Sequence, residues 1–100
     1  MPDPIAPFHN AQEALVLAAL DQLLPHHPHL SPDQPENTAV LADIACVALN
    51  RLPPRYIRHV ADLAFYQTPA TRGAAEEAAR EAVEYAIGFV VARNALGARR

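Results

Sequence analysis

The 100-residue chain contains no lysine and no tryptophan, and it has one cysteine and three glycines. Because Cys46 is alone, no disulfide bond can form within the chain. The glycines are scattered at Gly73, Gly88 and Gly97, so there is no glycine-rich loop of the kind that cradles phosphate. The only serine, Ser31, lies in a proline-rich stretch that is predicted to be a loop, so nucleophilic catalysis is poorly supported. These absences argue against an enzyme.

Long apolar runs are also missing. The longest, residues 14–20 and 85–92, are well short of the roughly 20 apolar residues that span a bilayer. The first nine residues hold three prolines and no basic residue, which is unlike a secretory signal peptide. We therefore expect a cytoplasmic protein that has no membrane partner.

The charge and composition limit the partners further. All eight basic residues are arginine, yet the net charge is −3 and the isoelectric point about 5.9. Binding to a nucleic acid polymer needs an extended basic face, which this balance disfavours. The hydrophobic fraction is 51%, but much of it is alanine, which buries little area. A small core of this kind gains stability by pairing with a copy of itself, so we expect a homodimer.

Prolines divide the first part of the chain. Residues 1–9 are predicted to form a proline-rich mobile tail. Asn10 has the chemistry of an N-cap for a first helix over 11–24, which Pro25 ends. The next stretch, 25–37, contains four prolines and is predicted to be a loop. It carries three histidines but no acidic or cysteine residues at fixed helical spacing, so we expect solvated side chains and no metal site. These histidines are His26, His27 and His29.

A second helix is predicted over 38–50, with Asn37 or Thr38 as its cap. Apolar residues lie around most of its circumference, which indicates a buried helix and an inert Cys46 thiol. Asp43 and Asn50 are seven residues apart and form a narrow polar line. One interpretation of this line is structural, with Asn50 in the left-handed conformation and Asp43 paired to Arg55 or to turn amides. The alternative is that both side chains face a ligand.

Pro53 and Pro54 stop this helix. An extended segment over 55–59 follows and is expected to pair across a dimer axis, and 62–67 has room for one helical turn. Thr68-Pro69 begins a last helix over 69–94 with a stripe of small residues that suits close packing. We therefore predict a compact all-α single domain over 10–96, with three main helices, a short extended segment after the LPPRY turn, and a frayed end at 97–100.

The chemistry of the chain concentrates after the second helix. Arg51, Arg55 and Arg58 lie within eight residues of one another, with Tyr56 between them. Guanidinium groups bind phosphate through two parallel hydrogen bonds, pair with guanine acceptors and stack on planar rings. A carboxylate such as Asp43 or Asp62 can accept from the N–H donors of guanine. The six candidate ligand-binding residues are Asp43, Asn50, Arg51, Arg55, Tyr56 and Arg58. The alternative is a structural network of cations.

One stretch resembles a known family. The sequence ALNRLPPRYI at Ala48–Ile57, preceded by the pair Asp43-Ile44, resembles the signature of the late competence development protein ComFB family. The continuation RHVADLAFYQTP at Arg58–Pro69 is similar to the form found in many bacterial members, and a looser likeness spans Glu13 to Val91.

The resemblance implies a helical, dimeric and non-catalytic regulatory protein without a cofactor. It implies a receptor for a cyclic dinucleotide, cyclic di-GMP or cyclic di-AMP, with a downstream protein partner. The alternative is a dimeric interaction module of competence or motility regulation that binds no small molecule. Some relatives have a cysteine cluster suited to zinc, but Glu36–Ala42 here contains no cysteine. The sequence also departs from the cyanobacterial relatives after Tyr56.

Overall fold

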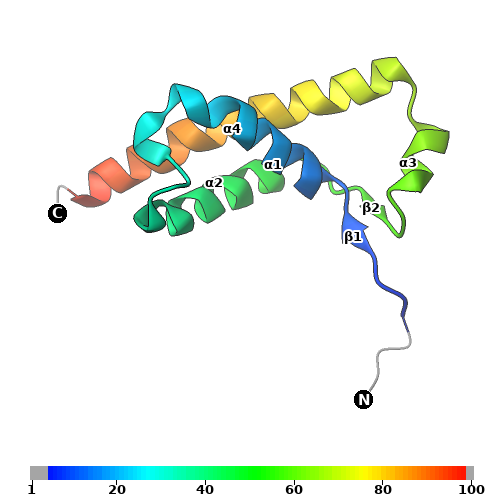
Figure 1. Cartoon of the computed structure of the whole chain (residues 1–100), viewed down its shortest axis with the longest axis horizontal. Coiled ribbons are helices and arrows are strands. Elements are labelled where there is room, and N and C mark those ends of the chain that lie inside the picture. Colours follow the sequence, from blue (N-terminus) through cyan, green and yellow to red (C-terminus); the bar gives the residue numbers. More distant parts are fainter. Residues whose placement is uncertain (1–4, 99–100) are drawn as a thin grey trace.

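A computed structural model describes residues 5–98 of the chain, with the backbone alone at 64–66 and 98. Three long helices, one short helix, three 3₁₀ turns and a two-stranded sheet make up a single domain (Figure 1). In chain order the elements are β1 His9–Asn10, α1 Gln12–Leu23, η1 Leu24–His26, η2 Pro28–Leu30, η3 Pro35–Asn37, α2 Thr38–Arg51, β2 Tyr56–Ile57, α3 Ala61–Tyr66 and α4 Pro69–Ala98. The predicted all-α class with three main helices and a short extended segment is confirmed.

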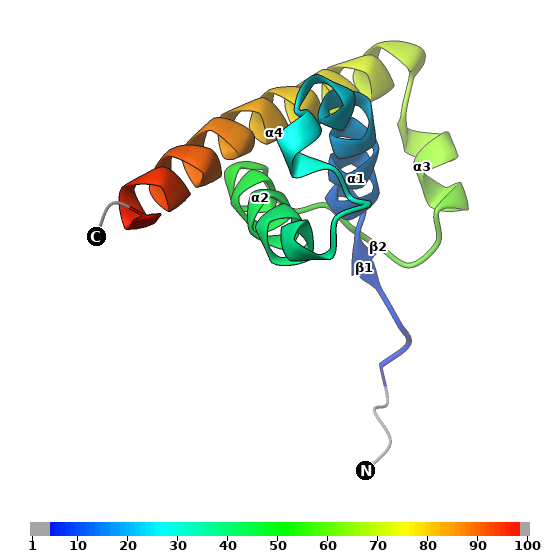
Figure 2. The ribbon, with the colours of Figure 1, turned by 60° about the vertical axis from the view of Figure 1, so that its left-hand side comes forward.

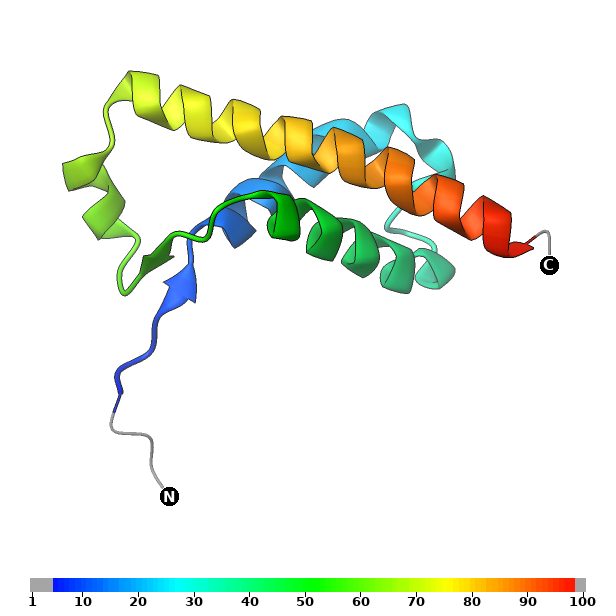
Figure 3. The same ribbon diagram turned by 180° about the vertical axis from the view of Figure 1, so that it is seen from behind.

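The core lies where α4 packs against both α1 and α2. Seen from behind, α2 and α4 run antiparallel along one side of the molecule, and α1 crosses on the other (Figure 3). The largest fully buried side chains are Val16 from α1, Ile44 from α2, and Val83 and Val90 from α4. The remaining core positions are largely alanine, which lets the helices approach closely but buries little area per residue.

The long helix α4 extends past the other two at its first turns (Figures 1 and 2). Its buried positions begin at Ala79, and within 69–78 only Ala75 is even half-buried. The stripe predicted from spacing is otherwise confirmed from Ala79 to Val90. The predicted end at residue 94 is wrong, because neither proline nor a turn-forming pair interrupts the helix before Ala98. The first turns of α4 therefore form an overhang above α3.

The start of α1 differs from the prediction. The residue at the cap position is Ala11, whose own side chain makes no capping hydrogen bond. The predicted cap, Asn10, still accepts through its carboxamide oxygen from the backbone N–H of Gln12, the first residue of α1, and also from that of Arg55. At the other end α1 stops at Leu23, and the chain continues into η1 because Pro25 fits the first turn of a 3₁₀ helix.

The proline-rich stretch 25–37 is a series of three 3₁₀ turns, which Asn37 holds together. This side chain is 8% exposed. Its Nδ2 group donates to the carbonyl oxygens of His29 at 3.0 Å and Ser31 at 2.9 Å. Asn37 therefore precedes α2 as predicted, but it ties down the loop and does not cap the helix with its side chain.

Helix α2 is less buried than the apolar pattern indicated. Only Ile44 and Ala48 are fully buried, while Asp43, Cys46 and Asn50 are exposed. The predictions of a buried helix and a buried thiol are therefore wrong. The reason is that α4 and α1 cover one side of α2 and nothing described covers the other. Asn50 lies inside the helix, which continues to Arg51, so it does not adopt the left-handed conformation.

The extended segment after the double proline pairs within its own chain. β2 is antiparallel to β1, with His9 opposite Ile57 and Asn10 opposite Tyr56. Within the chain, β2 thus pairs with the end of the stretch predicted to be a mobile tail. Pairing of its other edge across a dimer axis stays a prediction. Residues 5–8 of that stretch are exposed, and 1–4 lie outside the described residues. In residues 5–98 no helix is both long and apolar enough to cross a membrane.

Candidate anion-binding site

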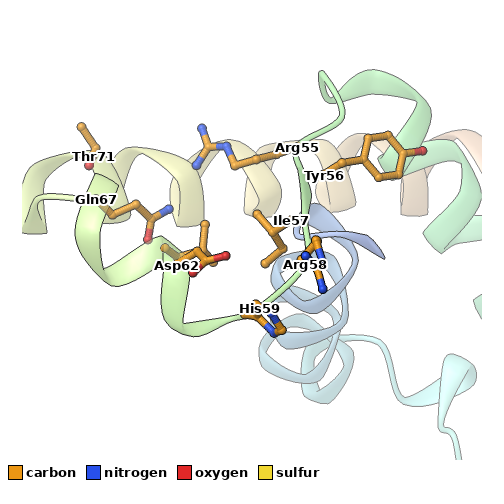
Figure 4. Close-up of a pocket in the computed structure, with 9 residues that line it drawn as sticks. Arg55, Tyr56, Ile57, Arg58, His59, Asp62, Gln67 and Thr71 are labelled. Atoms are coloured by element: carbon orange, nitrogen blue, oxygen red, sulfur yellow. The ribbon is translucent and has the colours of Figure 1, made fainter. Parts of the chain in front are cut away.

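A hollow of about 630 Å³ lies between the segment after the double proline, α3 and the first turn of α4 (Figure 4). Two of its lining residues are arginines, Arg55 and Arg58, and two are half-buried apolar residues, Ile57 and Leu63. The complete lining is Arg55, Tyr56, Ile57, Arg58, His59, Asp62, Leu63, Gln67 and Thr71. The hollow is therefore mixed in character, with cationic, polar and apolar groups around one space.

The double proline directs the chain into this position. Leu52 ends α2 in an extended conformation, as the residue before a proline must. The chain then leaves the axis of α2 and enters β2, which faces the overhang of α4 (Figure 3). On the other side, Thr68 and Thr71 fix the start of α4 by reciprocal hydrogen bonds of 2.8 and 3.1 Å between backbone N–H groups and side-chain oxygens.

The side chains of β2 and its neighbours point in different directions. In Figure 4 the Arg55 side chain points to the side where Gln67 and Thr71 lie, whereas the Tyr56 ring points away from them. Tyr56 instead meets Phe8 edge to face, with ring centroids 5.8 Å apart. This divergence follows from the alternation of side chains along an extended strand. Tyr56 therefore borders the hollow but does not place its ring in it.

The two arginines of the hollow are exposed, and among the described side chains neither forms an ion pair with a carboxylate. Asp62, which lines the same hollow, is half-buried. Arg55 also borders two smaller hollows, of about 460 and 340 Å³, under the overhang of α4. Two arginines and a carboxylate that accepts hydrogen bonds therefore border the same hollow.

The other three predicted ligand-binding residues lie elsewhere. Arg51 stacks on Tyr85 of α4, with its guanidinium carbon 3.7 Å from the ring centroid. Asp43 pairs with Arg93, with 3.1 Å between Oδ2 and Nη2, and not with Arg55. Asn50 is exposed on α2 and does not line the hollow. The structure thus brings together Arg55, Tyr56 and Arg58 and separates Asp43, Asn50 and Arg51 from them.

Two polar residues of the hollow, Gln67 and Thr71, were not among the sequence candidates. Both lie around the helix start at Thr68-Pro69, which the sequence does reveal. Only the position of the first turns of α4 in the fold shows that Gln67 and Thr71 share a hollow with Arg55. Two other lining residues, His59 and Asp62, follow Arg58 within four positions in the chain. This closeness in sequence is a signal that could have identified them.

The loop histidines stay apart from this site. The rings of His27 and His29 meet edge to face, with centroids 6.0 Å apart. Within the described residues, no three side chains of histidine, cysteine, aspartate or glutamate are grouped so that they could hold a metal ion.

The fold and the hollow define a class: a small helical domain with an exposed arginine-lined recess beside a proline-broken helix. The family model for the late competence development protein ComFB matches residues 9–94. Since that range covers most of the chain, the protein belongs to the ComFB family. Searches of curated proteins and of solved structures found no match.

Proposed function

We propose that this protein is a non-catalytic regulatory member of the ComFB family and that it binds a cyclic dinucleotide of the cyclic di-GMP type. The observation that supports the proposal is the pair Arg55 and Arg58 in one hollow, without carboxylate partners among the described side chains. A structural network of cations would place each guanidinium group against an acceptor, as Arg93 is placed against Asp43.

The chemistry of the hollow suits a purine nucleotide. Guanidinium groups bind phosphate oxygens through two parallel hydrogen bonds and also pair with the N7 and O6 acceptors of guanine. Asp62 supplies an acceptor for the N–H donors on the other edge of guanine, a role that the sequence offered to Asp43 or Asp62. A volume of about 630 Å³ is also within the usual range for small-molecule sites.

Calorimetry with cyclic di-GMP and with cyclic di-AMP tests this proposal. We expect heat of binding at tens of micromolar or less and its loss in Arg55→Ala, because Arg55 borders the main hollow and both smaller ones. Arg80→Ala is the matched control, since Arg80 is exposed on α4 and pairs with Glu84 at 3.3 Å. Absence of heat with both nucleotides, or equal losses in the two variants, would contradict the proposal.

A second candidate function is a homodimeric interaction module that acts without a small molecule. The supporting observation is the set of large apolar side chains that the described residues expose to solvent. The exposed large apolar residues, which are available for an interface between two copies, are Ile5, Phe8, Leu17, Tyr56, Val60, Tyr85, Phe89, Val91 and Leu96.

Light scattering after size exclusion distinguishes a monomer from a homodimer. We expect a mass of about twice the 10.9 kDa of the chain. A mass equal to one chain at every concentration tested would remove the dimer. Binding of a cyclic dinucleotide would be unaffected by that result, because it is measured separately and the hollow lies within one chain.

A further inference from the structure

The backbone that carries the arginine hollow is held by three consecutive residues at the beginning of the domain. The Asn10 Oδ1 atom accepts from the Arg55 backbone N–H at 2.9 Å. The Ala11 backbone N–H donates to the Arg55 carbonyl oxygen at 2.6 Å. The Gln12 Nε2 group donates to the Pro53 carbonyl oxygen at 2.9 Å. Both backbone polar groups of Arg55 are therefore bound to residues more than forty positions earlier in the chain.

These contacts are specific in chemistry. Asn10 Oδ1 accepts two hydrogen bonds at once, from Arg55 and, at 3.1 Å, from the backbone N–H of Gln12. Gln12 is 7% exposed, although a glutamine at the start of a helix is usually solvated. Its burial is explained by the bond to Pro53, which leaves no buried polar side-chain atom unsatisfied among the described residues.

The direction of Arg55 depends on this arrangement. Pro53 and Pro54 have no backbone N–H with which to anchor the turn. The ladder between β1 and β2 is only two residues long on each side. The bonds with Asn10, Ala11 and Gln12 thus add to this short ladder in fixing the start of the 55–59 segment.

We propose that Asn10 and Gln12 are positioning residues of the arginine hollow, whose bonds to the backbone of Arg55 and Pro53 set the position of the arginine side chains for ligand binding. The ligand part of this inference rests on the proposed function. Neither side chain lines the main hollow. Both act through the backbone of Pro53 and Arg55, so their removal changes the position of the guanidinium groups without removing a ligand contact.

The test compares Asn10→Ala with Asn10→Asp in the full chain. Aspartate keeps an oxygen acceptor for both N–H groups, whereas alanine removes it. Asn94→Ala, a change at an exposed position on α4, is the matched control. For each variant we would measure calorimetric binding of cyclic di-GMP, the helical circular dichroism spectrum with its melting temperature, and the hydrogen-exchange rate of the Arg55 amide by NMR. We expect about tenfold weaker binding and faster Arg55 exchange in Asn10→Ala, with both restored in Asn10→Asp.

The readouts keep the two proposals distinguishable. If the wild-type protein binds neither cyclic di-GMP nor cyclic di-AMP, the proposed function fails, and Arg55 exchange alone decides whether Asn10 positions the segment. If the wild type binds and Asn10→Ala binds equally well, the positioning role is overturned. Equal losses in Asn10→Ala and Asn10→Asp overturn it as well, because the oxygen acceptor would then be irrelevant. If Asn10→Ala lowers the melting temperature, Gln12→Glu, which keeps the shape but removes the donor to Pro53, repeats the test, and unchanged binding in it overturns the role.

Discussion

The stacking of Arg51 on Tyr85 leads to a prediction that separates the two arginines flanking the double proline. Arg51 and Arg55 have the same side chain and lie four residues apart, yet only Arg55 borders the hollow. We expect Arg51→Met, which retains most of the aliphatic stem, to reduce stability while leaving any binding of cyclic di-GMP unchanged. Arg55→Ala should abolish the binding and leave stability unchanged. The exposed Arg55 side chain has no ion pair or ring contact among the described residues to lose.

The size of the Arg51 effect follows from the geometry. The guanidinium carbon lies 3.7 Å from the ring centroid of Tyr85, and this residue is 46% exposed. Cation–π pairs at exposed sites contribute about 0.5–1 kcal/mol. Because Tyr85 is an exposed residue, we expect a coupling energy near the lower end, about 0.5 kcal/mol. Tyr85 also stacks on Phe89, with 6.1 Å between ring centroids, so it stays in place when Arg51 is changed.

A double-mutant cycle measures this coupling. Urea unfolding of the wild type, Arg51→Met, Tyr85→Leu and the double variant supplies the four free energies of unfolding, compared at a shared midpoint region to avoid extrapolation error. A coupling energy indistinguishable from zero would refute the stacking argument. If Arg51→Met weakened nucleotide binding as much as Arg55→Ala, Arg51 would belong to the ligand site and the separation of the two arginines would be wrong.

Three further predictions concern the rest of the fold. Ile44→Ala should lower the free energy of unfolding by about 2–5 kcal/mol, because Ile44 is fully buried between the three long helices; a loss below about 1 kcal/mol in urea unfolding would mean that the core collapses around the cavity. Asn37→Leu should cost about 1–3 kcal/mol in the same assay, since the carbonyl oxygens of His29 and Ser31 lose their donor, and an unchanged midpoint would show that the loop does not depend on it. Cys46 should react with a thiol reagent in the folded protein nearly as fast as in denaturant, because it is exposed; slow reaction would show that another surface covers that side of α2.

Much of the architecture could be predicted from local signals. Prolines at 25, 53, 54 and 69 mark helix boundaries because they lack the N–H that a helix interior needs. The spacing of small and branched residues in α4 identified the face that packs on α1 and α2. The cluster of arginines after the double proline indicated the region of the candidate site.

The failed predictions concern what covers each helix. Apolar residues around most of α2 indicated burial, but alanine is tolerated on an exposed face as well as in a core. The three other residues that were expected to be buried or paired on this helix, Asp43, Cys46 and Asn50, are also exposed. Sequence periodicity describes one helix, whereas burial depends on how many neighbours surround it.

The sequence by itself determined the three long helices, the break at the double proline and the gathering of arginines after it, because each depends on residues close together in the chain. Only the tertiary structure decided which arginines share a hollow. Gln67 and Thr71, around the start of α4, line the same hollow as Arg55. The Arg51 guanidinium group stacks on the Tyr85 ring instead. The Asn10 side chain accepts a hydrogen bond from the Arg55 backbone N–H. These partners come from distant parts of the sequence, and only the packing of helices around a common core sets which of them meet.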